Sequence, residues 1–124
     1  MVTLVYSGAC SHAPGITGRA HLVEDTAARD EFYAQFGEMR RQLEATRPDA
    51  LIVIAAEHFA NFFMNNMPAF CIGMAEHYEG PIEDPQWLAI EPVRVPGNPE
   101  LSRRLIVEIM QTVDVAYAEE WKFD

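Results

Sequence analysis

The strongest constraint on the fold is the apolar run at residues 50–56, which contains no charged residue, proline or glycine. An uninterrupted run of leucine, isoleucine, valine and alanine is typical of a strand buried on both faces of a parallel sheet. Residues 2–9 are also apolar and β-branched at their start, and a loop rich in proline and glycine follows them. The sequence therefore predicts two strands early in the chain.

A helix is predicted between these two strands. The large apolar residues within 25–45 recur at spacings of four, three and four positions, as on one face of an amphipathic helix: Phe32, Phe36, Met39 and Leu43. A strand, a helix and a strand in this order form a right-handed crossover with parallel strands. We therefore expect an α/β fold, three-layer and truncated, with a mostly parallel or mixed central sheet flanked by helices, in a single domain over residues 1–124.

The second half of the chain is predicted to add short strands and one more helix. Asn98 and Pro99 have the sequence of a helix start, and this helix is expected to end near Thr112. The segment 76–97 is rich in proline, glycine and acidic residues and is expected to be loop, with one edge strand inside it. The three predicted strands cover 69–74, 89–95 and 113–117.

Charge and cysteine content narrow the function classes. The 19 acidic and 9 basic residues give a formal charge of -10, which argues against binding nucleic acid or an anionic membrane. Cys10 and Cys71 are far apart and lie beside apolar residues, so they are interpreted as buried free thiols in a reducing compartment. The chain shows no secretory leader and no apolar run of membrane-spanning length. A cytoplasmic location is the expectation.

A histidine follows each of the two predicted early strands, His12 after 2–9 and His58 after 50–56. The carboxyl ends of parallel strands share one edge of a sheet, where open α/β sheets bind ligands, so this topology can place both imidazoles side by side. Two histidines and one carboxylate bind iron with open positions left for other ligands. For either histidine alone, a loop side chain bonded to backbone is the simpler interpretation. For the pair, a metal site is favoured.

Other residues near these histidines allow two interpretations each. Glu57 could orient the neighbouring imidazole as a hydrogen-bond acceptor, or it could be a solvated carboxylate at the strand end. Phe62 and Phe63 belong to a segment rich in phenylalanine and methionine, which suits the wall of an aromatic pocket but also ordinary core packing. His21 and His77 lack comparable partners and are interpreted as solvated.

Two other chemistries are disfavoured. Ser7 and Ser11 provide hydroxyl groups, but the chain has no Gly-x-Ser-x-Gly motif of the kind that exposes a nucleophilic serine. It also has no P-loop and no glycine fingerprint for a dinucleotide.

Three motifs occur in order along the chain: Ser11-His12-Ala13-Pro14-Gly15, Glu57-His58 followed by Phe62-Phe63, and Met67-Pro68-Ala69-Phe70-Cys71-Ile72-Gly73. Together they resemble the class III extradiol ring-cleavage dioxygenases, the superfamily of the protocatechuate 4,5-dioxygenase catalytic subunit. Residues 95–101 and the predicted last strand extend the resemblance over essentially the whole chain.

The resemblance implies a non-haem Fe(II) enzyme that uses dioxygen to cleave a catechol-type aromatic beside its diol. His12 and His58 match the two iron-binding histidines of the family, and zinc and manganese are alternative metals. The glutamate ligand and the acid/base histidines of the family would lie beyond Asp124, which matches the residue before one of those histidines. The 124-residue chain is therefore expected to be the N-terminal part of a catalytic domain, inactive alone.

The sequence also allows a function other than catalysis. Fold does not determine function, so the chain could be a non-catalytic metal- or protein-binding member of the same scaffold superfamily. The sequence also leaves open which aromatic diol is bound, and whether the protein forms a homo-oligomer or needs a small partner subunit.

Overall fold

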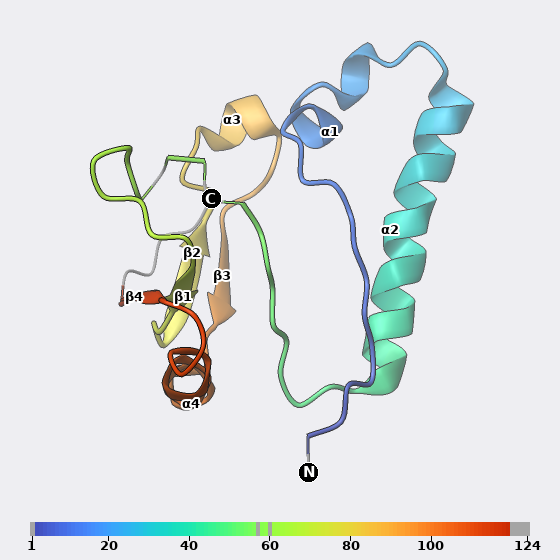
Figure 1. The fold of residues 1–124 in the computed structure, drawn as a ribbon. Helices are drawn as coiled ribbons and strands as arrows, with labels where there is room; N and C mark the ends of the chain where they lie inside the picture. The colour runs from blue at the N-terminus through green and yellow to red at the C-terminus, as the bar shows by residue number, and fades with distance from the viewer. Residues whose placement is uncertain (1, 57, 60, 120–124) are drawn as a thin grey trace. The chain divides into compact units, whose positions relative to one another are not determined.

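The chain forms two compact units, Met1–Val53 and Ile54–Asp124, in a computed structural model (Figure 1). The prediction of a single domain over 1–124 stays a prediction. The residues that the structure describes are 2–56, 58–59 and 61–119.

Helices dominate the first unit: α1 (Gly15–Gly18), the 3-10 turn η1 (Ala20–Leu22) and α2 (Thr26–Thr46). Helix α2 confirms the helix predicted over 25–45. It begins after Asp25, whose carboxylate accepts a hydrogen bond from the Ala28 N–H at 3.0 Å. It ends at Thr46. The next residue, Arg47, has a left-handed backbone with φ 47° and precedes Pro48, a residue that cannot continue a helix. None of the described helices is both long and apolar enough to span a membrane.

One stripe of α2 is shielded from water by its own unit. Phe36, Met39 and Leu43 are half-buried on it, as their spacing predicts. Phe32 is 45% exposed and meets the Phe36 ring edge-on, with ring centroids 5.2 Å apart. The N-terminal segment runs along this helix, because the Tyr6 hydroxyl donates a hydrogen bond to the Met39 carbonyl at 3.5 Å (Figure 1).

The strands described in the second unit pair in two small sheets. Strands β1 and β4 are parallel, with Ile72 opposite Tyr117, and β2 and β3 are antiparallel, with Tyr78 opposite Val95. Helix α4 packs against β1 (Figure 1). The elements in chain order are β1 (Cys71–Gly73), β2 (His77–Gly80), α3 (Pro85–Leu88), β3 (Val93–Pro96), α4 (Pro99–Ile109) and β4 (Ala116–Ala118).

The buried part of the second unit is small, and a tyrosine fills the space beside it. Tyr78 packs against Gly73 and Gly97 so closely that a Cβ atom on either glycine would press on its ring. The Tyr78 hydroxyl also accepts a hydrogen bond from the Ala75 N–H at 3.2 Å. The buried hydrophobic side chains among the described residues are Ala75, Leu88 and Ile106.

The two strands predicted most strongly from the sequence do not form in the described part of the chain. Residues 2–9 and 50–56 take part in no strand ladder, and Val2 and Ile54 are 100% and 92% exposed. A strand that is apolar on both faces needs neighbouring strands to pair with and helices to cover it, and neither run has a strand partner here. The predicted three-layer architecture around one central sheet is not shown. The described fold is mixed α/β with two two-stranded sheets.

The region 76–97 is more regular than its composition predicts. It holds β2, α3 and β3 rather than a loop with one strand. Helix α3 starts at Asp84, whose carboxylate accepts a hydrogen bond from the Gln86 N–H at 2.9 Å. His77, interpreted from the sequence as a solvated loop residue, instead lies in β2 with its side chain 32% exposed. Its Nε2 atom is 3.7 Å from Oε1 of Glu79.

Helix α4 and strand β4 confirm the last predicted helix and strand, with shifted ends. The predicted N-cap forms, since the Asn98 side-chain oxygen accepts a hydrogen bond from the Leu101 N–H at 3.1 Å. The helix ends at Ile109, before the predicted end at Thr112. Strand β4 starts within the predicted range 113–117 and continues one residue past it.

Candidate functional site

His12 lies in the first unit, in the exposed loop that leads into α1. Short-range hydrogen bonds shape the backbone after it. The Ser11 hydroxyl accepts a hydrogen bond from the Ala13 N–H at 3.3 Å, and the Ala13 carbonyl accepts one from the Ile16 N–H at 2.9 Å. These bonds lead the chain from His12 into α1, which begins at Gly15.

His58 lies in the second unit and is also exposed. The next residue, Phe59, has φ 61°, a left-handed conformation that costs a residue with a side chain about 1–2 kcal/mol. Further along, the Phe63 carbonyl accepts a hydrogen bond from the Asn66 N–H at 2.8 Å and closes a turn. Phe62 is half-buried and Phe63 is 57% exposed, so this aromatic segment is partly open to water.

The predicted convergence of His12 and His58 stays a prediction, because the two residues belong to different units. Glu57 and Asp124 lie outside the described residues. In the described ranges, no group of three or more histidine, cysteine, aspartate or glutamate side chains could hold a metal ion. Imidazole nitrogen is a suitable ligand for iron(II) or zinc, so His12 and His58 could fill two positions of such a metal site. The described residues do not supply the remaining ligands.

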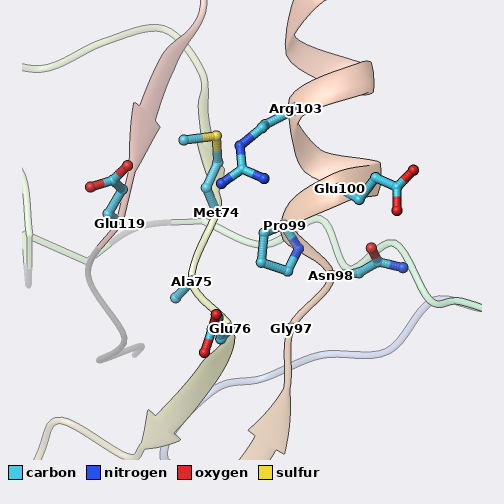
Figure 2. Close-up of a pocket in the computed structure, with 9 residues that line it drawn as sticks. All are labelled: Met74, Ala75, Glu76, Gly97, Asn98, Pro99, Glu100, Arg103 and Glu119. Carbon is cyan, nitrogen blue, oxygen red and sulfur yellow. The ribbon is translucent and has the colours of Figure 1, made fainter.

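The structure contains a hollow that the sequence did not predict (Figure 2). It has a volume of about 530 Å³ and lies where the chain leaves the parallel strands β1 and β4 and enters α4. Ligands of α/β proteins bind at such carboxyl ends of parallel strands. Two features of the sequence could have indicated this hollow. They are the Asn98-Pro99 helix start and the predicted strands on either side of it. None of the predicted site residues lines this hollow.

The charges around the hollow are mixed. Three carboxylates and one guanidinium line it: Glu76, Glu100, Glu119 and Arg103. Figure 2 shows Arg103 reaching from α4 toward Met74. Glu100 also pairs with Arg104 one turn along the helix, at 2.5 Å. The lining holds polar groups of both signs but no imidazole or thiol, so it lacks the nitrogen ligands that the sequence assigned to a metal.

The two cysteines are free thiols, as predicted, but the prediction that they are buried is wrong, because both residues are exposed. Cys71 lies in β1, within the third of the motifs described above. Partial burial of the sulfur still raises the pKa of the Cys71 thiol, because the charged thiolate is less well solvated there than in water. The thiol is therefore held in its neutral form to higher pH than a thiol in water.

Comparison with known families finds one whose match includes both histidines. Residues 7–124 match the family described as the catalytic LigB subunit of aromatic ring-opening dioxygenase, a match that includes both His12 and His58. The chain belongs to this family. This match confirms the predicted resemblance of the chain to the class III extradiol dioxygenases, which include the LigB family.

Curated relatives of this LigB-family chain carry one enzyme name, 2,3-dihydroxyphenylpropionate/2,3-dihydroxicinnamic acid 1,2-dioxygenase. The protein from Photorhabdus laumondii is 29% identical over 91 residues, which cover 72% of this chain and 26% of the relative. The protein from Pseudomonas putida, the second of two forms by its name, is 32% identical over 69 residues, or 56% of this chain and 21% of the relative. The protein from Mycolicibacterium vanbaalenii is 31% identical over 72 residues, or 52% of this chain and 23% of the relative.

This LigB-family chain thus spans about a quarter or less of the length of these relatives. No solved structure matches it.

Proposed function

We propose that this chain supplies two histidine ligands, His12 and His58, to an Fe(II) site for extradiol cleavage of a catechol-type aromatic by dioxygen. The observation that carries the proposal is the family match over residues 7–124, which includes both histidines. The names of the relatives support a substrate with two neighbouring hydroxyl groups on an aromatic ring. Which diol this protein would use is left open by these names.

Each residue has a distinct part in the proposal. Iron bound there would supply open positions for the two oxygens of the diol and for dioxygen. His12 and His58 would each donate one nitrogen as neutral imidazole, and Glu57 would orient the second ring as a hydrogen-bond acceptor. Phe62 and Phe63 would contact the substrate ring and exclude water from it.

Replacement of each histidine by alanine tests the ligand assignment. Purified chain is titrated under anaerobic conditions with Co(II), whose visible spectrum reports the ligands of a site that also accepts Fe(II). We expect the unaltered chain to bind Co(II) weakly, because the described residues complete no three-ligand group. His12→Ala and His58→Ala should each abolish the binding.

The matched control is His21→Ala, which removes another exposed histidine from the first unit. It should leave the Co(II) titration unchanged. Equal loss in all three variants, or binding that survives both His12→Ala and His58→Ala, would contradict the assignment.

A second candidate is a non-catalytic member of the same scaffold superfamily that binds a metal or a protein. Metal analysis and catechol-dependent oxygen uptake by the whole protein purified from its source separate the two. Iron with oxygen uptake supports the dioxygenase, zinc or manganese with uptake supports the same chemistry with another metal, and a protein without uptake supports the binding role.

A further inference from the structure

We propose that the first unit binds a small aromatic carboxylic acid in a second hollow, with Arg29 holding the carboxylate. This inference goes beyond the proposed function, because it uses neither histidine and no metal. The second hollow, called here the α1–α2 hollow, has a volume of about 300 Å³, at the lower end of small-molecule pockets. It lies within residues 1–53. The residues of its lining that bear on binding are Ile16, Val23, Ala28, Arg29, Phe32 and Tyr33.

Aromatic and aliphatic side chains form the walls of the α1–α2 hollow. The Tyr33 hydroxyl donates a hydrogen bond to the Ile16 carbonyl, which ties α2 to α1 across the hollow. The rings of Phe32 and Tyr33 meet edge-on, with centroids 5.6 Å apart. Phe32 is 45% exposed, so a ligand in the hollow can bury part of its ring. A third aromatic ring packs well against such a pair, and this favours an aromatic body for the ligand.

Arg29 gives the α1–α2 hollow its charge. Among the described residues that line the hollow, Arg29 alone is charged, and its side chain is only 29% exposed. Its Nε and Nη2 atoms donate to Oδ1 of Asp30 at 2.9 and 2.7 Å, along one side of the guanidinium. A guanidinium has five N–H donors, and no described residue of the first unit accepts from the other three, on Nη1 and Nη2. This end of the group can bind the two oxygens of a carboxylate.

The charge of the first unit permits an anionic ligand. Residues 1–53 contain seven acidic and five basic residues, so only two of the ten surplus negative charges belong to this unit. Asp30 is the carboxylate that neutralises Arg29, and its own side chain is 68% exposed. An ion pair open to water on one side is weak, so a ligand carboxylate can share the guanidinium with Asp30. Removal of the Asp30 charge should therefore tighten the binding of an acid.

An NMR titration of the isotope-labelled 124-residue chain with 3-phenylpropionate tests the proposal. The matched neutral probe is 3-phenylpropanamide, which has the same ring and length but no charge. We expect the acid to shift the backbone amide signals of the residues that line the α1–α2 hollow, with a Kd of about 1 mM. The amide should bind about tenfold more weakly. Neither probe has ring hydroxyl groups and no metal is added, so the result is independent of the proposed iron site.

Three substitutions separate the parts of the hollow. Arg29→Met removes the guanidinium but keeps an apolar stem, so it should weaken binding of the acid about tenfold and leave binding of the amide unchanged. Asp30→Asn should tighten binding of the acid about threefold or more, a gain that loss of folding cannot produce. Ala28→Leu fills the hollow without disfavouring the helix, and it should weaken binding of both probes.

The matched controls lie on the same helix. Arg40 pairs with Glu44 at 2.8 Å, as Arg29 pairs with Asp30, but neither residue lines the α1–α2 hollow. Arg40→Met and Glu44→Gln should therefore bind both probes as the unaltered chain does. The proposal would be overturned by an absence of shifts at about 10 mM acid. Equal affinity for the acid and the amide, shifts confined to residues 54–124, or effects of the control variants as large as those of Arg29→Met and Asp30→Asn would also overturn it.

Discussion

Gly97 lies so close to the Ala75 carbonyl oxygen that one added methyl group has no room. A Cβ atom at this position would also meet the Tyr78 ring at 3.0 Å, and the backbone carbonyl cannot move aside as a flexible side chain would. We therefore expect Gly97→Ala to lower the free energy of unfolding by about 1–3 kcal/mol, measured by urea denaturation.

Gly37 provides the opposite control for this glycine substitution. It lies inside α2, and a Cβ atom there would meet nothing within 4 Å. Gly37→Ala should raise the free energy of unfolding by about 0.5–1 kcal/mol, because alanine loses less backbone entropy in a helix. A loss of similar size in both variants would show that the contact of Gly97 with Ala75 is not the cause.

Cys71 makes the stability of the fold depend on pH in the alkaline range. Burial raises the pKa of its thiol from the ordinary value of 9.0, so the folded chain holds this proton more tightly than the unfolded chain. The stability from the neutral thiol is fully present below pH 9.0 and is lost as pH rises through the raised folded value. In a Cys10→Ser background, alkylation of Cys71 should reach half its maximal rate at higher pH in buffer than in urea. Identical midpoints in the two solvents would disprove this.

At the scale of elements, the start of α4 depends on one side-chain hydrogen bond. The Asn98 oxygen accepts it from the Leu101 N–H at 3.1 Å, which satisfies one of the free donors in the first turn. Asn98→Ala should cost about 1 kcal/mol of stability and lower the midpoint of thermal unfolding followed by circular dichroism. Asn98→Asp keeps an acceptor oxygen at the same place and should remain near the unaltered chain. An equal loss in both variants would mean that the cap is not the stabilising contact.

Helices and strands of this chain differ in how well the sequence predicts them. Helix α2 follows from the three- and four-residue spacing of its apolar side chains, and α4 follows from its cap and proline, all of which are local signals. The runs 2–9 and 50–56 carry equally clear apolar signals, yet they form no ladder in the described structure. A strand needs partners distant in sequence, so its formation is decided outside the run itself.

At the scale of the whole molecule, the candidate metal site depends on groups from both units. His12 and His58 belong to different units, so a shared metal would have to be bound by both. The metal titration tests this directly, since loss of either histidine should abolish the binding.

The sequence by itself determined the two long helices, the Asn98 cap, the free thiols, the acidic balance and the family, whose motifs contain His12 and His58. These properties depend on short spacings or on residue identity. Only the tertiary structure decided that β1 pairs with β4 in parallel, that His77 lies in a strand and that a hollow forms beside Arg103. Each of these depends on contacts between residues far apart in the chain. Local pattern does not specify such contacts, because the same apolar run can pair with any strand edge that is free to receive it.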